Sequence, residues 1–251
     1  MDATQDRREF KFLLSAEEGE RFRSFVADRI PVDRGAENGY PVLSEYYDTD
    51  DRQSYWQKIW GAGNRRRVRA RVYGRPDGLI PPAAFIEIKH KLGADGVKRR
   101  AALPIESLRE LSAGRIPEAL LEAGRSKADQ HVVAELQDLV IKNGARPVVQ
   151  VRYDRMAYDS GPEGTIRITF DTGLRCRLEM KPLEPDDRDF PLSVVEKDVA
   201  VVEVKVIGAV PTWLREATGS FGLQVRSMSK YCQSLELHDP AVTRTPLAAI
   251  F

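Results

Sequence analysis

The sequence is poor in the residues that bind metals through sulfur or imidazole. It has two cysteines, Cys176 and Cys232, and three histidines in 251 residues, with no C-x-x-C pair. This composition argues against a cysteine–histidine zinc site and against a disulfide-stapled scaffold. Any metal chemistry is therefore expected to depend on carboxylates.

Long apolar runs and a large charge excess are also missing. No run approaches the roughly 20 residues that a membrane helix needs, and the first ten residues hold no apolar signal region. We therefore expect a cytoplasmic protein without a membrane segment. The net charge is +1, from 39 Lys+Arg against 38 Asp+Glu, which argues against general nucleic-acid binding. A basic site must arise from local clustering.

The most informative stretch runs from residue 65 to residue 91. In 65–74 and 85–91 the residue type changes with period two, which predicts β-strands because side chains alternate between the faces of a strand. Arg67, Arg69 and Arg71 would share one face, opposite Val68 and Ala70. Such a face is usually solvent-exposed, and only repetition of the pattern favours a functional role.

The pattern does recur along the chain. A helix from Ser15 to about Asp28 should begin with a capping box, and another is expected over 50–60. Apolar residues at helical spacing predict a helical insertion around 104–144. A single domain is expected over 1–251, with a core at about 7–235 and a loosely held tail at 238–251. Strands are expected at 7–14, 42–48, 65–74, 85–91, 97–103, 147–158, 164–172, 176–180 and 199–206.

About eight antiparallel strands tend to close into a barrel, which removes their edges. The predicted fold is therefore α+β: a closed eight-stranded antiparallel barrel, or tunnel, with peripheral helices. An inward charged face would hold twelve cations against three carboxylates, a set that only a polyanion can neutralise. Arginine donates two hydrogen bonds to phosphate, and Mg²⁺ is held by carboxylates together with phosphate oxygens.

Short motifs then appear in a characteristic order. They are Arg7-x-Glu9-x-Lys11, Arg69-x-Arg71-x-Tyr73-Gly74, Glu87-x-Lys89, Val97-Lys98, Tyr153-Asp154-Arg155, Arg167-Ile168-Thr169, Glu203-Val204-Lys205 and Ser229-Lys230-Tyr231. The ordered set resembles the VTC-domain branch of the triphosphate tunnel metalloenzyme superfamily and covers residues 7 to about 235. Each motif is weak alone, and the order makes the set specific.

This resemblance implies a metal-dependent polyphosphate polymerase that uses Mn²⁺ or Mg²⁺ and transfers the γ-phosphate of ATP to a growing polyphosphate chain. ATP or triphosphate and inorganic polyphosphate would be its partners. Glu203 would hold the metal, with Glu9 and Glu87 as further candidates. The phosphate ligands it implies are Lys11, Arg69, Arg71, Lys89, Lys98, Arg155, Arg167 and Lys230, with Arg7, Arg67, Lys91 and Lys205 as secondary contacts.

Several alternatives stay open. The hydrolytic branches begin Glu-x-Glu-x-Lys, and Arg7 replaces their first Glu, which favours binding polyphosphate over hydrolysing triphosphate. Glu9 could be a metal ligand or an ion-pair partner, and Glu87 could be a structural partner of Lys89 or Arg71. Arg65 and Arg66 are expected to be surface charges. A triphosphatase or a non-catalytic polyphosphate sensor remains possible in place of a polymerase.

Overall fold

The structure is a computed structural model that describes residues 7–33, 35, 37–74, 83–93, 95–122, 126–161 and 164–243. Its strands are β1 (Arg7–Ser15), β2 (Tyr40–Asp48), β3 (Asn64–Tyr73), β4 (Ala84–Leu92), β5 (Asp95–Leu103), β6 (Arg146–Asp159), β7 (Ile166–Arg177), β8 (Leu192–Ser193) and β9 (Val199–Ile207). Its α-helices are α1 (Ala16–Ala27), α2 (Gln53–Ile59), α3 (Leu108–Ser112), α4 (Lys127–Leu136), α5 (Thr212–Ser220), α6 (Lys230–His238) and α7 (Pro240–Thr243).

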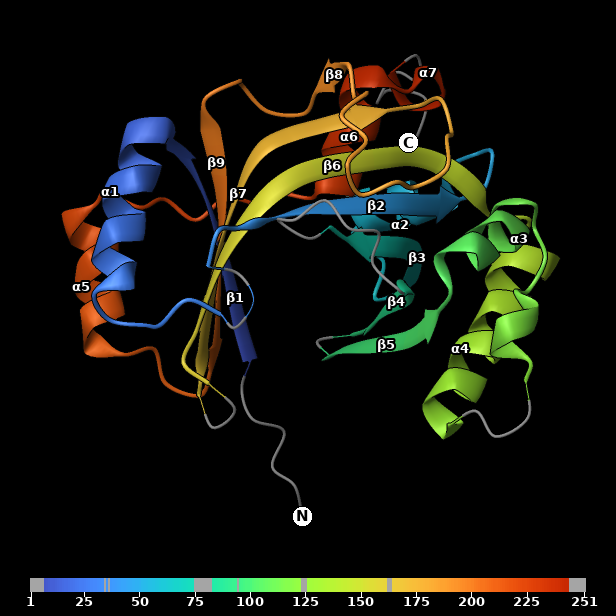
Figure 1. The fold of residues 1–251 in the computed structure, drawn as a ribbon, viewed down its shortest axis with the longest axis horizontal. Coiled ribbons are helices and arrows are strands. Elements are labelled where there is room, and N and C mark those ends of the chain that lie inside the picture. The colour runs from blue at the N-terminus through green and yellow to red at the C-terminus, as the bar shows by residue number, and fades with distance from the viewer. Residues whose placement is uncertain are drawn as a thin grey trace. The chain divides into compact units, whose positions relative to one another are not determined.

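The long strands form one sheet in the order β1-β9-β7-β6-β2-β3-β4-β5, with β8 paired to β7 (Figure 1). The predicted α+β class with an antiparallel sheet of eight long strands is confirmed. β1 and β5 are the two ends of the hydrogen-bonded order, and closure of the barrel stays a prediction.

One predicted break in the sheet was wrong. Two strands were expected over 164–172 and 176–180. Instead one strand, β7, continues through Gly173 (φ 60°) and ends at Arg177. Glycine adopts this left-handed conformation without steric cost, so the strand absorbs an irregular residue instead of stopping.

The described chain divides into two compact units. Unit 1 comprises Met1–Pro41, Tyr153–Leu174 and Val195–Ser229, and unit 2 comprises Val42–Arg152, Arg175–Val194 and Lys230–Phe251. The expectation of a single domain stays a prediction. Each unit has its own hydrophobic core, described in turn below.

In unit 1 the apolar faces of β1, β7 and β9 pack against α1 and α5. Ser15 and Glu18 form the predicted capping box, so α1 begins as expected. Phe22 is fully buried and its ring lies 5.8 Å from that of Phe170 and 5.3 Å from that of Phe221. Fully burying such a side chain contributes about 1.5–3 kcal/mol. The charged residues of these strands must therefore lie on the opposite face.

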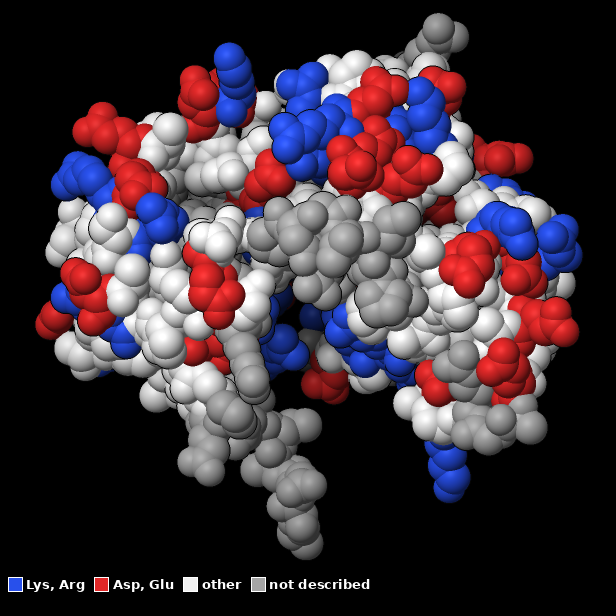
Figure 2. Space-filling view, viewed as in Figure 1, with Lys and Arg blue, Asp and Glu red and all other residues white. Residues whose placement is uncertain are grey.

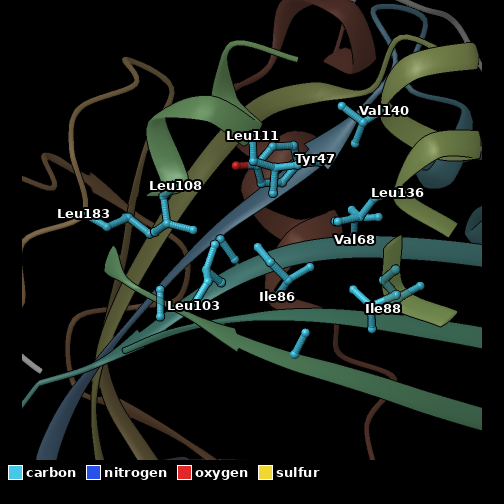
Figure 3. Close-up of a cluster of buried hydrophobic side chains, with 14 of the residues drawn as sticks. Tyr47, Val68, Ile86, Ile88, Leu103, Leu108, Leu111, Leu136, Val140 and Leu183 are labelled. Atoms are coloured by element: carbon cyan, nitrogen blue, oxygen red, sulfur yellow. The ribbon is translucent and has the colours of Figure 1, made fainter. Parts of the chain in front are cut away.

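In unit 2 the predicted insertion packs on the apolar face of β3, β4 and β5 (Figure 3). Leu111, Leu136 and Val140 are fully buried there, as their spacing predicted. Leu121, another apolar residue of the insertion, is 58% exposed. The last part of the insertion is a π-helix over Gln137–Lys142, and short 3₁₀ turns lie at Ile105–Ser107 and Glu118–Leu120.

Part of the expected C-terminal tail is ordered in the structure. α7 follows α6, and Asp239 and Val242 are buried. Residues 244–251, the remainder of that tail, lie outside the described residues. Among the residues that the structure describes, no helix is long and apolar enough to cross a membrane.

Candidate functional site

The face of unit 2 that lies away from its core carries six of the twelve predicted phosphate ligands. Strand register places Arg67 opposite Lys89 and Arg69 opposite Glu87, and β5 continues these rows. Residues directly opposite on neighbouring strands share a face. We call this set of seven cations the cationic face: Arg67, Arg69, Arg71, Lys89, Lys91, Lys98 and Arg100, with the carboxylate of Glu87 among them.

Glu87 is the centre of the cationic face. Its side chain is 2% exposed, and its oxygens lie 2.6 Å from Arg69 Nη2 and 2.5 Å from Lys98 Nζ. Arg100 and Arg71 stand farther off, at 3.7 and 3.8 Å. Burial by itself would raise the pKa of Glu87, but the surrounding charges, Arg69 and Arg71 foremost, lower it to about 2. Glu87 is therefore ionised at neutral pH and holds these cations in place.

Several cations of this face lie directly opposite one another. Arg67 faces Lys89 across β3 and β4, and Lys89 faces Lys98 across β4 and β5. Like charges directly opposite on a sheet are destabilising. Burial and the charge of Arg69 lower the pKa of Lys98 despite its contact with Glu87. Figure 2 shows both signs of charge mixed over the visible surface, with Lys and Arg gathered where Figure 1 places β4 and β5.

Two residues of β2, Ser44 and Tyr46, also contact the cationic face, although the sequence did not identify them. The Arg71 Nε donates a hydrogen bond of 3.1 Å to Ser44 Oγ, and Arg69 Nη1 donates one of 3.4 Å to the Tyr46 hydroxyl. Burial alone would raise the pKa of Tyr46, but the charges of Arg69, Arg71 and Lys230 lower it. The sequence predicted this strand, but not its register against β3.

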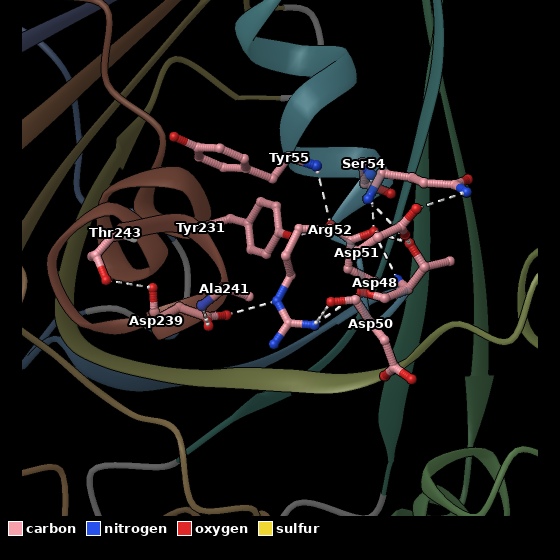
Figure 4. Close-up of polar contacts among 12 residues, drawn as sticks. Asp48, Asp50, Asp51, Arg52, Ser54, Tyr55, Tyr231, Asp239, Ala241 and Thr243 are labelled. Carbon is pink, nitrogen blue, oxygen red and sulfur yellow. Dashed lines mark hydrogen bonds and ion pairs between the residues drawn. The ribbon is translucent and has the colours of Figure 1, made fainter. Parts of the chain in front are cut away.

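Lys230, the last predicted phosphate ligand, begins α6, and its position depends on a buried polar network (Figure 4). Asp48 accepts hydrogen bonds from the backbone N–H groups of Ser54 (2.9 Å) and Tyr55 (3.1 Å), and from the hydroxyl of Tyr231. Arg52 Nε donates to Asp239 at 2.6 Å, beyond the end of α6. These contacts hold both ends of α6 and so orient its first residue.

In unit 1 the charged face mixes cations and carboxylates. Lys11 Nζ lies 3.2 Å from Glu9 and 3.3 Å from Glu203, and donates a hydrogen bond of 3.0 Å to the carbonyl oxygen of Met228. The other oxygen of Glu203 contacts Lys205 Nζ at 2.6 Å. Arg7 is exposed at the start of β1, opposite Ile207.

The two arginines of this face are held by aspartates. Arg155 Nε and Nη2 donate to the two oxygens of Asp171 at 2.6 and 2.7 Å, and this pair is buried. Arg167 contacts Asp33 at 2.5 Å and Asp159 at 2.8 Å. The sequence-based charge inventory omitted all three aspartates, and it was wrong for this unit. Among the contacts described here, four cations of unit 1 meet five carboxylates.

Other expectations for single residues can also be compared with the structure. Arg65 and Arg66 were expected on the surface, but each is half-buried, and Arg66 pairs with Asp138. Glu87 contacts Arg71 and three further cations, as a structural partner would. The catalytic, phosphate-binding and metal-binding roles of the predicted residues stay predictions.

The candidate ligands for a divalent metal are the carboxylates of Glu9 and Glu203. Within the described residues, no group of three or more His, Cys, Asp or Glu could hold a metal ion. Glu9 and Glu203 do converge, on the ammonium group of Lys11. One or two carboxylates suffice for Mg²⁺ where phosphate oxygens supply the other ligands. These two residues therefore fit a metal that arrives with its phosphate substrate.

Two curated proteins with similar sequences share one name. Two curated proteins named vacuolar transporter chaperone complex subunit 4 are similar to the chain: the one from Trypanosoma brucei brucei is 28% identical and the one from Trypanosoma cruzi 29%, each over 239 residues. The alignments cover 83% of this chain and 30% of each relative, so the chain spans about a third of their length.

Solved structures share the fold at low sequence identity. A candidate adenylyl cyclase from Hippeastrum has a TM-score of 0.54 at 14% identity, covering 93% of this chain and 97% of its own. A candidate adenylate cyclase from Bacillus halodurans has a TM-score of 0.50 at 13% identity, covering 90% and 93%. The VTC domain family matches residues 6–238, nearly the whole chain, and confirms the resemblance seen in the motifs. The chain belongs to the VTC domain family.

Proposed function

We propose that this protein is a metal-dependent polyphosphate polymerase that transfers the γ-phosphate of ATP to a growing chain of inorganic polyphosphate. The cationic face of unit 2 carries this proposal, because four of its cations converge on the buried carboxylate of Glu87 and three more lie in the same rows of the sheet. A linear phosphate chain offers anionic oxygens along its whole length and would relieve the repulsion between these side chains. Membership of the VTC domain family supports the same substrate class.

We propose further that the sheet closes into a tunnel and that the cationic face lies inside it. Eight long antiparallel strands, apolar on the face that packs against the helices and charged on the other, support this arrangement. Enclosure would exclude water and strengthen every contact between arginine and phosphate.

The chemistry that these residues can perform is positioning and charge neutralisation. Arg69 and Lys98 would bind phosphate oxygens while Glu87 keeps their side chains aligned. Phosphoryl transfer depends mainly on such alignment and on stabilising the charge of the transferred group. The attacking terminal phosphate is already ionised, so no side chain has to act as a general base.

Glu203 and Glu9 would hold the Mn²⁺ or Mg²⁺ ion, which supplies Lewis-acid stabilisation of phosphate charge when bound. Their present partner is the Lys11 ammonium group. Lys11 would then move its donors to a phosphate oxygen, and Lys205 would remain beside Glu203 at 2.6 Å. This exchange keeps the charge of unit 1 nearly balanced.

A triphosphatase is the second candidate. Its supporting observation is the fold shared with the Hippeastrum protein, whose structure is described as showing a dominant triphosphatase activity. The two functions differ in the acceptor, which is a phosphate chain for a polymerase and water for a triphosphatase.

Incubation with ATP and Mn²⁺ or Mg²⁺, followed by electrophoresis of the products, distinguishes these functions. A ladder of long chains is expected from a polymerase, and orthophosphate alone would show a triphosphatase. Binding of triphosphate without turnover would show a sensor. Arg69→Ala should abolish the ladder, whereas Arg109→Ala removes an exposed guanidinium of α3 in the same unit and should retain it.

A further inference from the structure

The arginines of β3 continue beyond the cationic face. Arg71, Arg69 and Arg67 alternate along the strand, and Arg65 is the next residue with the same orientation. Strands rise 3.2–3.4 Å per residue, so the row spans roughly 20 Å from Arg71 to Arg65. Arg65 lies opposite Lys91, which extends the positive row across β4.

The last arginine of the row lines a pocket. Arg65 lines a cavity of about 150 Å³ at the start of β3, together with the end of β2, one side of α2 and the segment after the π-helix. A water molecule occupies roughly 30 Å³ of liquid volume, so a phosphate group fits. The polar side chains used in the argument below are Asp48, Gln53, Gln57, Asn64 and Asn143.

The lining favours an anion. Asp48 is the one carboxylate that lines the described pocket, and its oxygens already accept hydrogen bonds from α2 and Tyr231. Arg65 Nη1 donates to the carbonyl oxygen of Ala62, which fixes the guanidinium at the pocket. The Asn64 side-chain oxygen lies 2.9 Å from His90 Nε2, and that contact does not use its NH₂ group. Amide and guanidinium donors suit phosphate oxygens.

We infer that this pocket is a terminal subsite for an extended phosphate chain whose other phosphates lie along the arginine row of β3. This inference rests on the proposed function and adds the direction in which the chain runs. The four cations around Glu87 bind the part of the chain shared by all substrates. Arg65 then adds a charge-assisted contact that a short substrate bound at Glu87 does not reach, so affinity rises with chain length.

The test is calorimetric titration with tripolyphosphate and with a long polyphosphate of defined length, in EDTA and at fixed ionic strength. Wild-type protein should bind the long chain more tightly per molecule. Arg65→Ala should reduce the ratio of long-chain to tripolyphosphate affinity roughly tenfold, because one charge-assisted hydrogen bond to the longer chain is lost. Arg109→Ala, which removes a matched exposed charge, should preserve the ratio.

A second variant covers the case in which Arg65→Ala fails to fold. Gln57→Glu places a negative charge in the pocket from α2 and should lower the same ratio while the unfolding midpoint is retained. Equal affinity of the wild type for both probes, or equal losses for both probes in the variants, would overturn the subsite and leave the proposed function standing. Failure of the wild type to bind either probe would instead remove the proposed function.

Discussion

Glu87→Gln is the most informative single substitution in the cationic face. The change keeps the shape of the side chain and removes the negative charge on which four cations converge. The pKa of Glu87 is lowered from 4.5 to about 2, which corresponds to roughly 3 kcal/mol of stability at neutral pH. No discount for solvent screening is needed, because the side chain is 2% exposed. Loss of one partner from a buried ion pair typically lowers the free energy of unfolding by about 3–5 kcal/mol, and the value derived for Glu87 lies in this range.

The pH dependence follows from the direction of this change in pKa. A carboxylate whose pKa is lower in the folded protein stabilises it fully above about 4.5 and loses that contribution as the pH falls toward 2. The variant has no such group to protonate. The wild type should therefore be about 3 kcal/mol more stable at pH 7, and the difference should shrink steadily below pH 4.5.

Urea unfolding monitored by the fluorescence of the three tryptophans measures this difference at each pH. Glu118→Gln, at an exposed position of the same unit, is the matched control and should change stability by less than about 0.5 kcal/mol. The reasoning is refuted if Glu87→Gln costs no more than this control at pH 7, or if the gap fails to narrow in acid.

Three further substitutions test other parts of the site. Asp171→Asn leaves the buried Arg155 without its bidentate carboxylate and should cost about 3–5 kcal/mol in urea unfolding, and a loss below 1 kcal/mol would contradict this. Tyr231→Phe removes the hydroxyl that donates to Asp48 and should lower the free energy of unfolding by about 1–3 kcal/mol. It should also weaken the affinity for tripolyphosphate, because Lys230 is displaced. Unchanged stability would exclude the anchoring role of Tyr231. Glu203→Gln should abolish the turnover that Mn²⁺ or Mg²⁺ supports, while calorimetry in EDTA still detects binding of tripolyphosphate. Retained metal-supported turnover would exclude Glu203 as a ligand.

Much of the fold could be predicted from the sequence because its determinants are local. Alternation of charged and apolar residues located the strands, and helical spacing located the insertion, since both periods belong to the backbone itself. The capping box of Ser15 and Glu18 fixed the start of α1. Two strands were expected over 164–172 and 176–180, because local rules do not show that one strand can pass through Gly173.

The sequence by itself therefore determined which residues carry charge and which strand face each one occupies. Only the tertiary structure decided how those charges are shared. Register placed Glu87 beside Lys98 and Arg100, and it placed Tyr46 beside Arg69. Folding also brought Asp33, Asp159 and Asp171 onto the arginines of unit 1. The physical reason is that a side chain's face follows from the pleat of its own strand, whereas its charge partner depends on which segments pair across the sheet.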